Sequence, residues 1–132
     1  MEGLREIVIG SGGDIKKGIL AFLVENGIRS AYIIGAVGSA KDVVVAAPVE
    51  NELPLRTTEV KYPVACEVVG FSGEVMEWEK ADPRIREVYP DKDDPLFVHI
   101  HIAAAISGGQ MFGGGFRGGT AFRSLRVFLT RC

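Results

Sequence analysis

The only two histidines of the chain, His99 and His101, stand two residues apart in the apolar segment Phe97–Ile102. Alternating strand side chains point to opposite faces, so both imidazoles lie on one face of a predicted strand. Such a pair binds a divalent metal, forms hydrogen bonds at a pocket or subunit interface, or acts as a general base. Because zinc sites use three or four protein ligands, we expect no firmly held cofactor. At most a weakly bound zinc or other divalent metal is expected, completed by water, Glu67 or another subunit.

Seven of the seventeen glycines lie between positions 108 and 119, directly after the histidine strand. Gly113, Gly115 and Gly118 match the spacing Gly-x-Gly-x-x-Gly. The dinucleotide-binding fingerprint requires a helix and a later acidic residue, whereas a strand pattern follows here and the acid is missing. Gly113, Gly114 and Gly115 are therefore expected to form a tight hairpin and to allow close backbone packing, including at a subunit contact.

Charge is unevenly distributed along a chain whose formal net charge is −2. The region 67–94 holds nine acidic and four basic residues, whereas the region 95–132 has four arginines and no acid. Three of these, Arg117, Arg123 and Arg126, are candidates for nucleic-acid or anion contacts, or they pair with the acidic region within or between subunits. The net charge opposes a uniformly basic surface, so weak and non-specific DNA binding is the most we expect.

Nucleophilic catalysis has little support. Cys66 lies within an apolar strand pattern, which favours an inert buried thiol, and no serine stands in a Gly-x-Ser-x-Gly elbow. Glu67, the charged residue of that strand, is an edge residue, a partner for an arginine, or a site carboxylate. We therefore expect a protein that is not an enzyme.

The remaining pattern predicts one domain, residues 1–132, of the α+β class. It has one main N-terminal helix over 14–26 and a mainly antiparallel sheet. The expected strands are 4–9, 28–35, 42–47, 64–76, 97–106 and 121–130, with a weaker one at 57–62 and a turn at 35–40. Residues 77–95 are polar and are expected to be an exposed excursion with a short helix near 84–88.

The cellular compartment can be inferred from the composition. Two cysteines far apart indicate free thiols, the first residues lack the apolar run of a leader, and no segment has about 18 consecutive apolar residues. A cytoplasmic protein without a membrane span is expected.

The order of these features resembles the plants-and-prokaryotes-conserved domain. The resemblance rests on the segments 13–15, 26–28, 33–39, 67–73, 99–101 and 109–114 and covers nearly the whole chain. It implies an α+β domain that assembles as a homotrimer and binds partners of a transcription-related or DNA-associated kind. Family members often carry a third histidine at the position of Gly115, which completes a metal site. Glycine at this position removes that third ligand from this chain. The alternative function is small-molecule or metal binding, including that of an uncharacterised enzyme, near His99 and His101 at a subunit interface.

Overall fold

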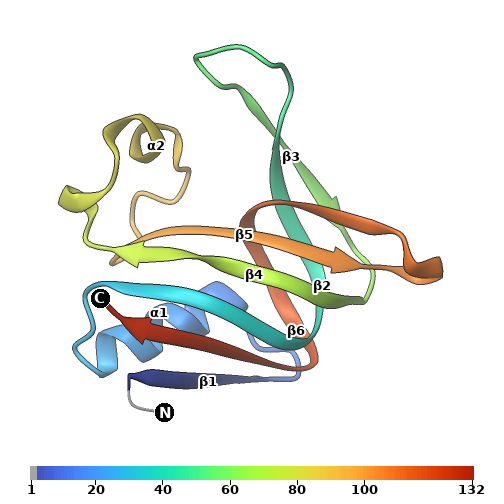
Figure 1. Cartoon of the computed structure of the whole chain (residues 1–132). Coiled ribbons are helices and arrows are strands. Elements are labelled where there is room, and N and C mark those ends of the chain that lie inside the picture. The colour runs from blue at the N-terminus through green and yellow to red at the C-terminus, as the bar shows by residue number, and fades with distance from the viewer. Residues whose placement is uncertain (1–2) are drawn as a thin grey trace.

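The computed structural model describes residues 3–132. Six strands and two α-helices account for most of these residues (Figure 1). In chain order they are β1 (Leu4–Gly10), α1 (Ile15–Glu25), β2 (Ala31–Pro48), β3 (Thr57–Tyr62), β4 (Cys66–Met76), α2 (Pro83–Val88), β5 (Phe97–Ala105) and β6 (Met111–Arg131). Single 3₁₀ turns occupy Trp78–Lys80 and Ser107–Gly109.

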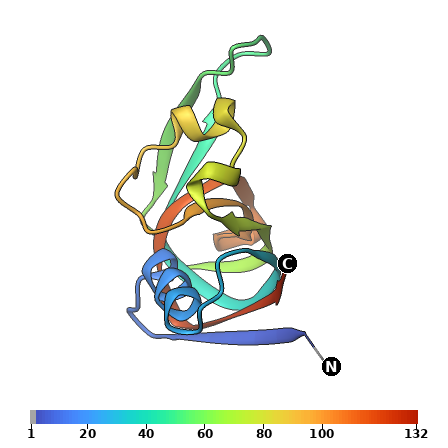
Figure 2. The same cartoon turned by 90° about the vertical axis from the view of Figure 1, so that its left-hand side faces the viewer.

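The sheet closes on itself into a small barrel. Its strand order is β1-β6-β5-β4-β2-β3, and β6 also pairs with β2, which joins the two sides. Figure 2 looks along this ring, with α1 beside it and the β2–β3 arm projecting from it. All the strand pairings are antiparallel. The predicted class, an α+β fold with a mainly antiparallel sheet and one main helix, is confirmed.

Two predicted turns are instead parts of long strands. β2 runs continuously through residues 35–40, with bulges where the register shifts between Ile33 and Gly35 and between Gly38 and Ala40. The glycines 113–115 lie inside β6, while the turn from β5 into β6 falls at Ser107–Gly109. These glycines therefore do not form the expected hairpin. They bend the strand and permit close packing, because a Cβ on Gly113 would lie 2.7 Å from the Ile102 oxygen.

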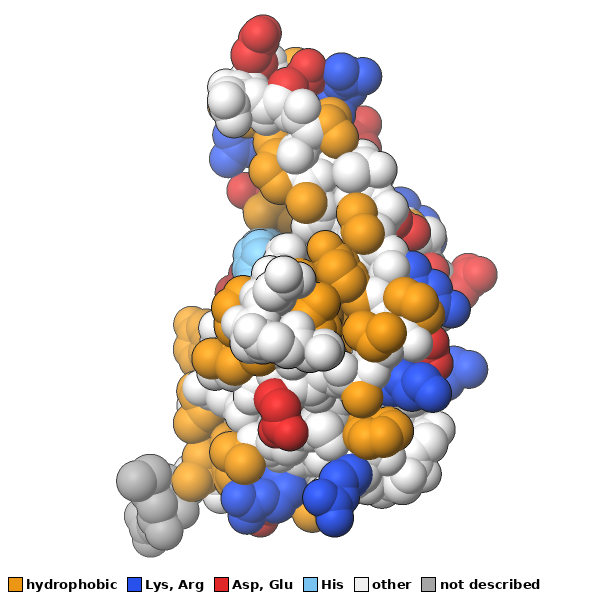
Figure 3. Space-filling view, turned by 90° about the vertical axis from the view of Figure 1, so that its right-hand side faces the viewer, with side chains coloured by type: hydrophobic (Ala, Val, Ile, Leu, Met, Phe, Trp, Pro, Cys, Tyr) orange, Lys and Arg blue, Asp and Glu red, His pale blue; other side chains and the backbone are white. Residues whose placement is uncertain are grey.

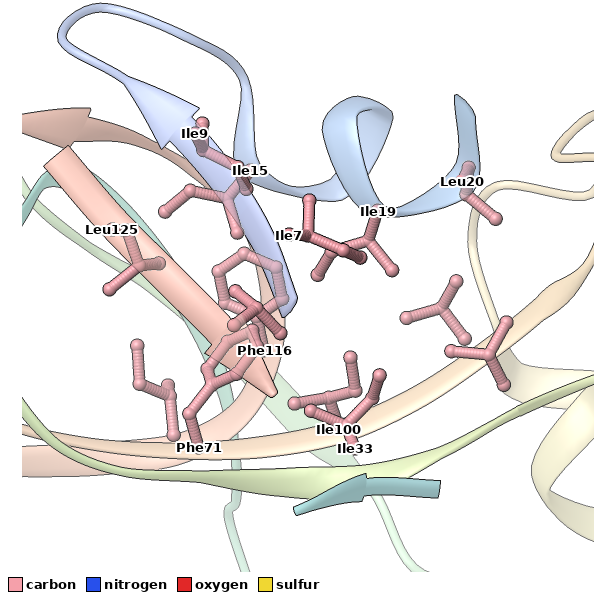
Figure 4. Close-up of a cluster of buried hydrophobic side chains, with 14 of the residues drawn as sticks. Ile7, Ile9, Ile15, Ile19, Leu20, Ile33, Phe71, Ile100, Phe116 and Leu125 are labelled. Atoms are coloured by element: carbon pink, nitrogen blue, oxygen red, sulfur yellow. The ribbon is translucent and has the colours of Figure 1, made fainter. Parts of the chain in front are cut away.

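Alternating aliphatic residues create the core. Ile7, Ile9 and Leu125 pack against the buried face of α1, and Phe71 meets Phe116 edge to face inside the barrel (Figure 4). Asp14 caps α1 by accepting a hydrogen bond from the Lys17 backbone N–H at 2.8 Å. The helix prediction over residues 14–26 is thus confirmed with its cap.

The region 77–95 is only partly the exposed excursion that its composition suggests. Its short helix is present at Pro83–Val88. Ala81 and Tyr89, however, are buried in the core, and Trp78, Tyr89 and Phe97 form a cluster of edge-to-face rings. A few aromatic side chains therefore fix a polar segment onto the barrel, a property that average polarity does not reveal.

Within residues 3–132, no helix is long and apolar enough to cross a membrane.

Candidate functional site

Strand β5 presents the histidines as its alternation predicts. Val98, Ile100, Ile102 and Ala104 are buried in the core, whereas His99 is partly exposed and His101 is exposed. The two imidazole rings have centroids 5.3 Å apart and planes inclined at 64°. A histidine side chain is visible at the surface below the projecting arm in Figure 3. The pair is therefore accessible to a ligand or to another chain.

The carboxylate beside this pair belongs to Glu74. Its Oε1 lies 3.5 Å from His99 Nδ1, and the register of β4 and β5 places Glu74 directly opposite His99. The sequence did not indicate Glu74 as a site residue, because neither strand alone determines the register between them.

Glu67 is remote from the histidines. It lies opposite Ala105, whereas His101 lies opposite Ser72, five residues further along β4. At about 3.3 Å per residue, the separation along the strand is roughly 16 Å. The expectation that Glu67 completes the histidine group within one chain is therefore wrong.

The surroundings of His101 favour the neutral form of its imidazole. His101 is exposed at the surface, but the atoms around its ring desolvate it in part. This partial desolvation, the neighbouring His99 and the guanidinium of Arg117 together lower the pKa of His101. A neutral imidazole retains an acceptor nitrogen, which can bind a metal or accept a hydrogen bond.

Gly115 is the cross-strand partner of His101 on β6. Side chains of directly paired residues share one face, so a residue larger than glycine at this position would lie beside the imidazole of His101. The position that matches the family's third histidine therefore does face the histidine pair.

The described part of one chain does not complete a metal site. Within residues 3–132, no group of three or more histidine, cysteine, aspartate or glutamate side chains is placed to hold one ion. A catalytic zinc site needs three protein ligands. The two imidazoles supply two, and Gly115 has no side chain that could supply a third.

The candidate arginines lie in three separate environments. Arg117 lies beside the ring of Tyr89 and 4.0 Å from Glu59, while Arg126 lies 3.5 Å from Glu6 and beside the ring of Phe128. Arg123 donates its backbone N–H to the hydroxyl of Ser39. Two of the three arginines thus face carboxylates of this chain.

Cys66, the thiol considered as a nucleophile, is buried. Cys66 is a free cysteine at the start of β4, and desolvation raises the pKa of its thiol. This is the environment of a structural thiol rather than a thiolate nucleophile.

The chain belongs to the family of the Plants and Prokaryotes Conserved domain, whose model matches residues 6–132. No curated protein matches in a comparison of sequences.

Several solved structures share the fold. A protein from Archaeoglobus fulgidus described as metal-containing is 23% identical, with a TM-score of 0.73 over 97% of this chain and 78% of that one. A plant- and prokaryote-conserved protein from Pyrococcus horikoshii is 20% identical, with a TM-score of 0.70 over 98% and 78%. A candidate DNA-binding protein from Bacteroides thetaiotaomicron is 16% identical, with a TM-score of 0.69 over 99% and 80%. At these identities the likeness establishes the fold.

Proposed function

We propose that this domain is a non-enzymatic, self-associating module that forms a homotrimer and presents a surface to a partner protein. The observation that carries the proposal is an outer apolar face of the sheet, made of Val8 on β1 and Tyr32, Ile34 and Val37 on β2. These side chains are 65%, 51%, 53% and 55% exposed, respectively.

The strand register brings parts of this face together. Val8 and Val37 both lie opposite Arg126, one on each side of β6, and Phe128 lies opposite Gly35, beside Ile34. Exposed apolar side chains that cluster in this way are typical of interaction surfaces. These side chains are already partly covered, so complete burial of each valine or isoleucine would contribute about 1–1.5 kcal/mol before the cost of association.

The charges on the outer apolar face favour another copy of this chain as the partner that covers it. The pair Glu6–Arg126 lies between its apolar residues, so this face offers charges of both signs to a neighbouring copy. In a ring of three copies the contact is head to tail, and this face meets a different surface of the next copy. The trimeric state is what family membership leads us to propose.

A pair of substitutions tests the outer apolar face. Val37→Asp places a charge within this face and is expected to shift the protein toward the monomer. Val24→Asp is the matched control, because Val24 is exposed to a similar degree on α1. Sedimentation velocity measures both. An unchanged assembly in Val37→Asp, with the fold intact by circular dichroism, would contradict the proposal.

The partner is proposed to be a protein of the transcription-related kind, and direct DNA binding is proposed to be weak and non-specific. Arg117 and Arg126 already face carboxylates, so the free positive charge available to phosphates in one chain is small. A tight, sequence-selective DNA complex at physiological salt would overturn this part.

A second candidate function is the binding of a small ligand or a weakly held divalent metal at His99 and His101. The close ring pair and the open position at Gly115 favour it. Water or another subunit would have to supply the remaining ligands.

A further inference from the structure

A concave region lies at the end of the barrel where β5 turns into β6. It has a volume of about 400 Å³, within the size range of small-molecule sites. Figure 3 looks onto this end of the molecule, where hydrophobic side chains gather with acidic and basic ones among them. Its lining includes Ser39, Cys66, Glu67, Ile106, Phe122 and Arg123.

Arg123 differs from every other arginine of the chain. Each of the other eight donates a side-chain hydrogen bond or forms an ion pair: the residues are Arg5, Arg29, Arg56, Arg84, Arg86, Arg117, Arg126 and Arg131. The Arg123 guanidinium has no such partner in the part of the chain that the structure describes. Its backbone is nevertheless anchored, because its N–H donates to Ser39 Oγ at 3.2 Å.

Glu67 faces the same concave region from the other side of Ser39. Ser39 pairs with Glu67 across β2 and β4 and accepts the hydrogen bond from Arg123 of β6. With strands about 4.8 Å apart, the backbones of Glu67 and Arg123 are roughly 10 Å apart. Among residues 3–132 the carboxylate forms no ion pair, so the two opposite charges flank the region without joining each other.

The surface between these charges is neutral and partly apolar. Ile106 and Phe122 supply hydrocarbon, and Ser39 supplies a hydroxyl. The Cys66 thiol is buried, and its raised pKa keeps it protonated at neutral pH. A ligand for this region therefore combines an anionic end, a cationic end and an aliphatic body.

We propose that this region binds a small zwitterion, an α-amino acid with an aliphatic side chain. Arg123 receives the carboxylate in the two-pronged geometry that guanidinium groups favour. Glu67 accepts hydrogen bonds from the ammonium group, and the side chain packs against Ile106 and Phe122. The site is distinct from the histidine pair and does not depend on the proposed self-association.

Leucine is the probe, titrated calorimetrically into the protein in its natural assembly state. Two fragments of the probe separate the charges: 4-methylpentanoate lacks the ammonium group, and 3-methylbutylamine lacks the carboxylate. We expect saturable binding of leucine, one molecule per chain, with each fragment binding about tenfold more weakly or worse.

Two variants locate the site. Arg123→Gln is expected to weaken leucine binding by about tenfold or more, and Glu67→Gln by a similar factor. Arg5→Gln and Glu52→Gln are the controls, because neither residue lines the region, and they should leave the affinity unchanged.

Three outcomes would overturn the proposal. They are an absence of saturable binding at millimolar leucine, equal affinity for 4-methylpentanoate and leucine, and undiminished binding in Arg123→Gln. Circular dichroism and sedimentation of each variant separate loss of the site from loss of the fold or assembly.

Discussion

His99 Nδ1 lies 3.5 Å from the Oε1 of Glu74, and the two residues face each other directly across β4 and β5. This contact gives the histidine face a negative edge at His99, while His101 lies toward Arg117. The two imidazoles thus differ in their electrostatic surroundings although they share one strand face.

The first prediction is that His101 titrates below the usual histidine value of about 6.5. Partial desolvation of its ring, His99 and Arg117 lower its pKa in the folded state. The unfolded state therefore binds more protons, so acidification through the unfolded value toward the folded one costs stability, and neutral pH removes that cost. Titration of the imidazole carbon-bound protons by NMR measures the pKa. Arg117→Gln should raise it, and a value at or above 6.5 in the wild-type protein would show that the repulsion is ineffective.

The second prediction concerns the region 77–95. Tyr89 is buried and contacts Trp78 and Phe97, so Tyr89→Ala should lower the free energy of unfolding by about 3–5 kcal/mol. Val88→Ala is the neighbouring control at an exposed position and should change it by less than about 0.5 kcal/mol. Chemical denaturation measures both. Equal free energies of unfolding for the two variants would indicate that this region is an exposed excursion that does not stabilise the fold.

The third prediction separates two adjacent glycines of β6. Gly114 has φ +154°, and a Cβ there would lie 2.5 Å from the Ala46 oxygen. Gly114→Ala should therefore destabilise the protein by about 1–3 kcal/mol. A Cβ on Gly115 meets its nearest atom at an ordinary 3.6 Å, so Gly115→Ala should be tolerated. Thermal unfolding distinguishes the two variants, and the reverse order of stability would refute the assigned close approach.

The fourth prediction concerns metal. Protein purified without an affinity tag should hold at most a partly occupied zinc, because one chain supplies two imidazoles. Gly115→His should add a third imidazole beside His101 and raise zinc affinity, with the gain lost in a further His101→Ala change. Elemental analysis and competition with a chelator measure this. One tightly held ion per wild-type subunit, lost in His99→Ala, His101→Ala protein, would contradict the prediction.

The sequence predicted correctly those features that depend on residues close together in the chain. The cap at Asp14, the face shared by His99 and His101, and the burial of Cys66 all followed from spacing and residue type. The fold class followed from the same alternation.

The errors arose where distant segments decide the structure. Gly38 and Gly114 looked like turn residues, but each lies in a long strand where another backbone approaches closely. Only the register of β4 against β5 shows that Glu74, and not Glu67, lies beside the histidines. Register and barrel closure depend on packing between strands far apart in sequence, which a single sequence does not specify.

The central proposal is self-association through the outer apolar face. Sedimentation equilibrium of the wild-type chain over a wide concentration range tests it most directly. We predict a mass of three chains that persists on dilution, because the exposed residues Val8, Tyr32, Ile34 and Val37 are then covered. A mass of one chain at every concentration would contradict the account.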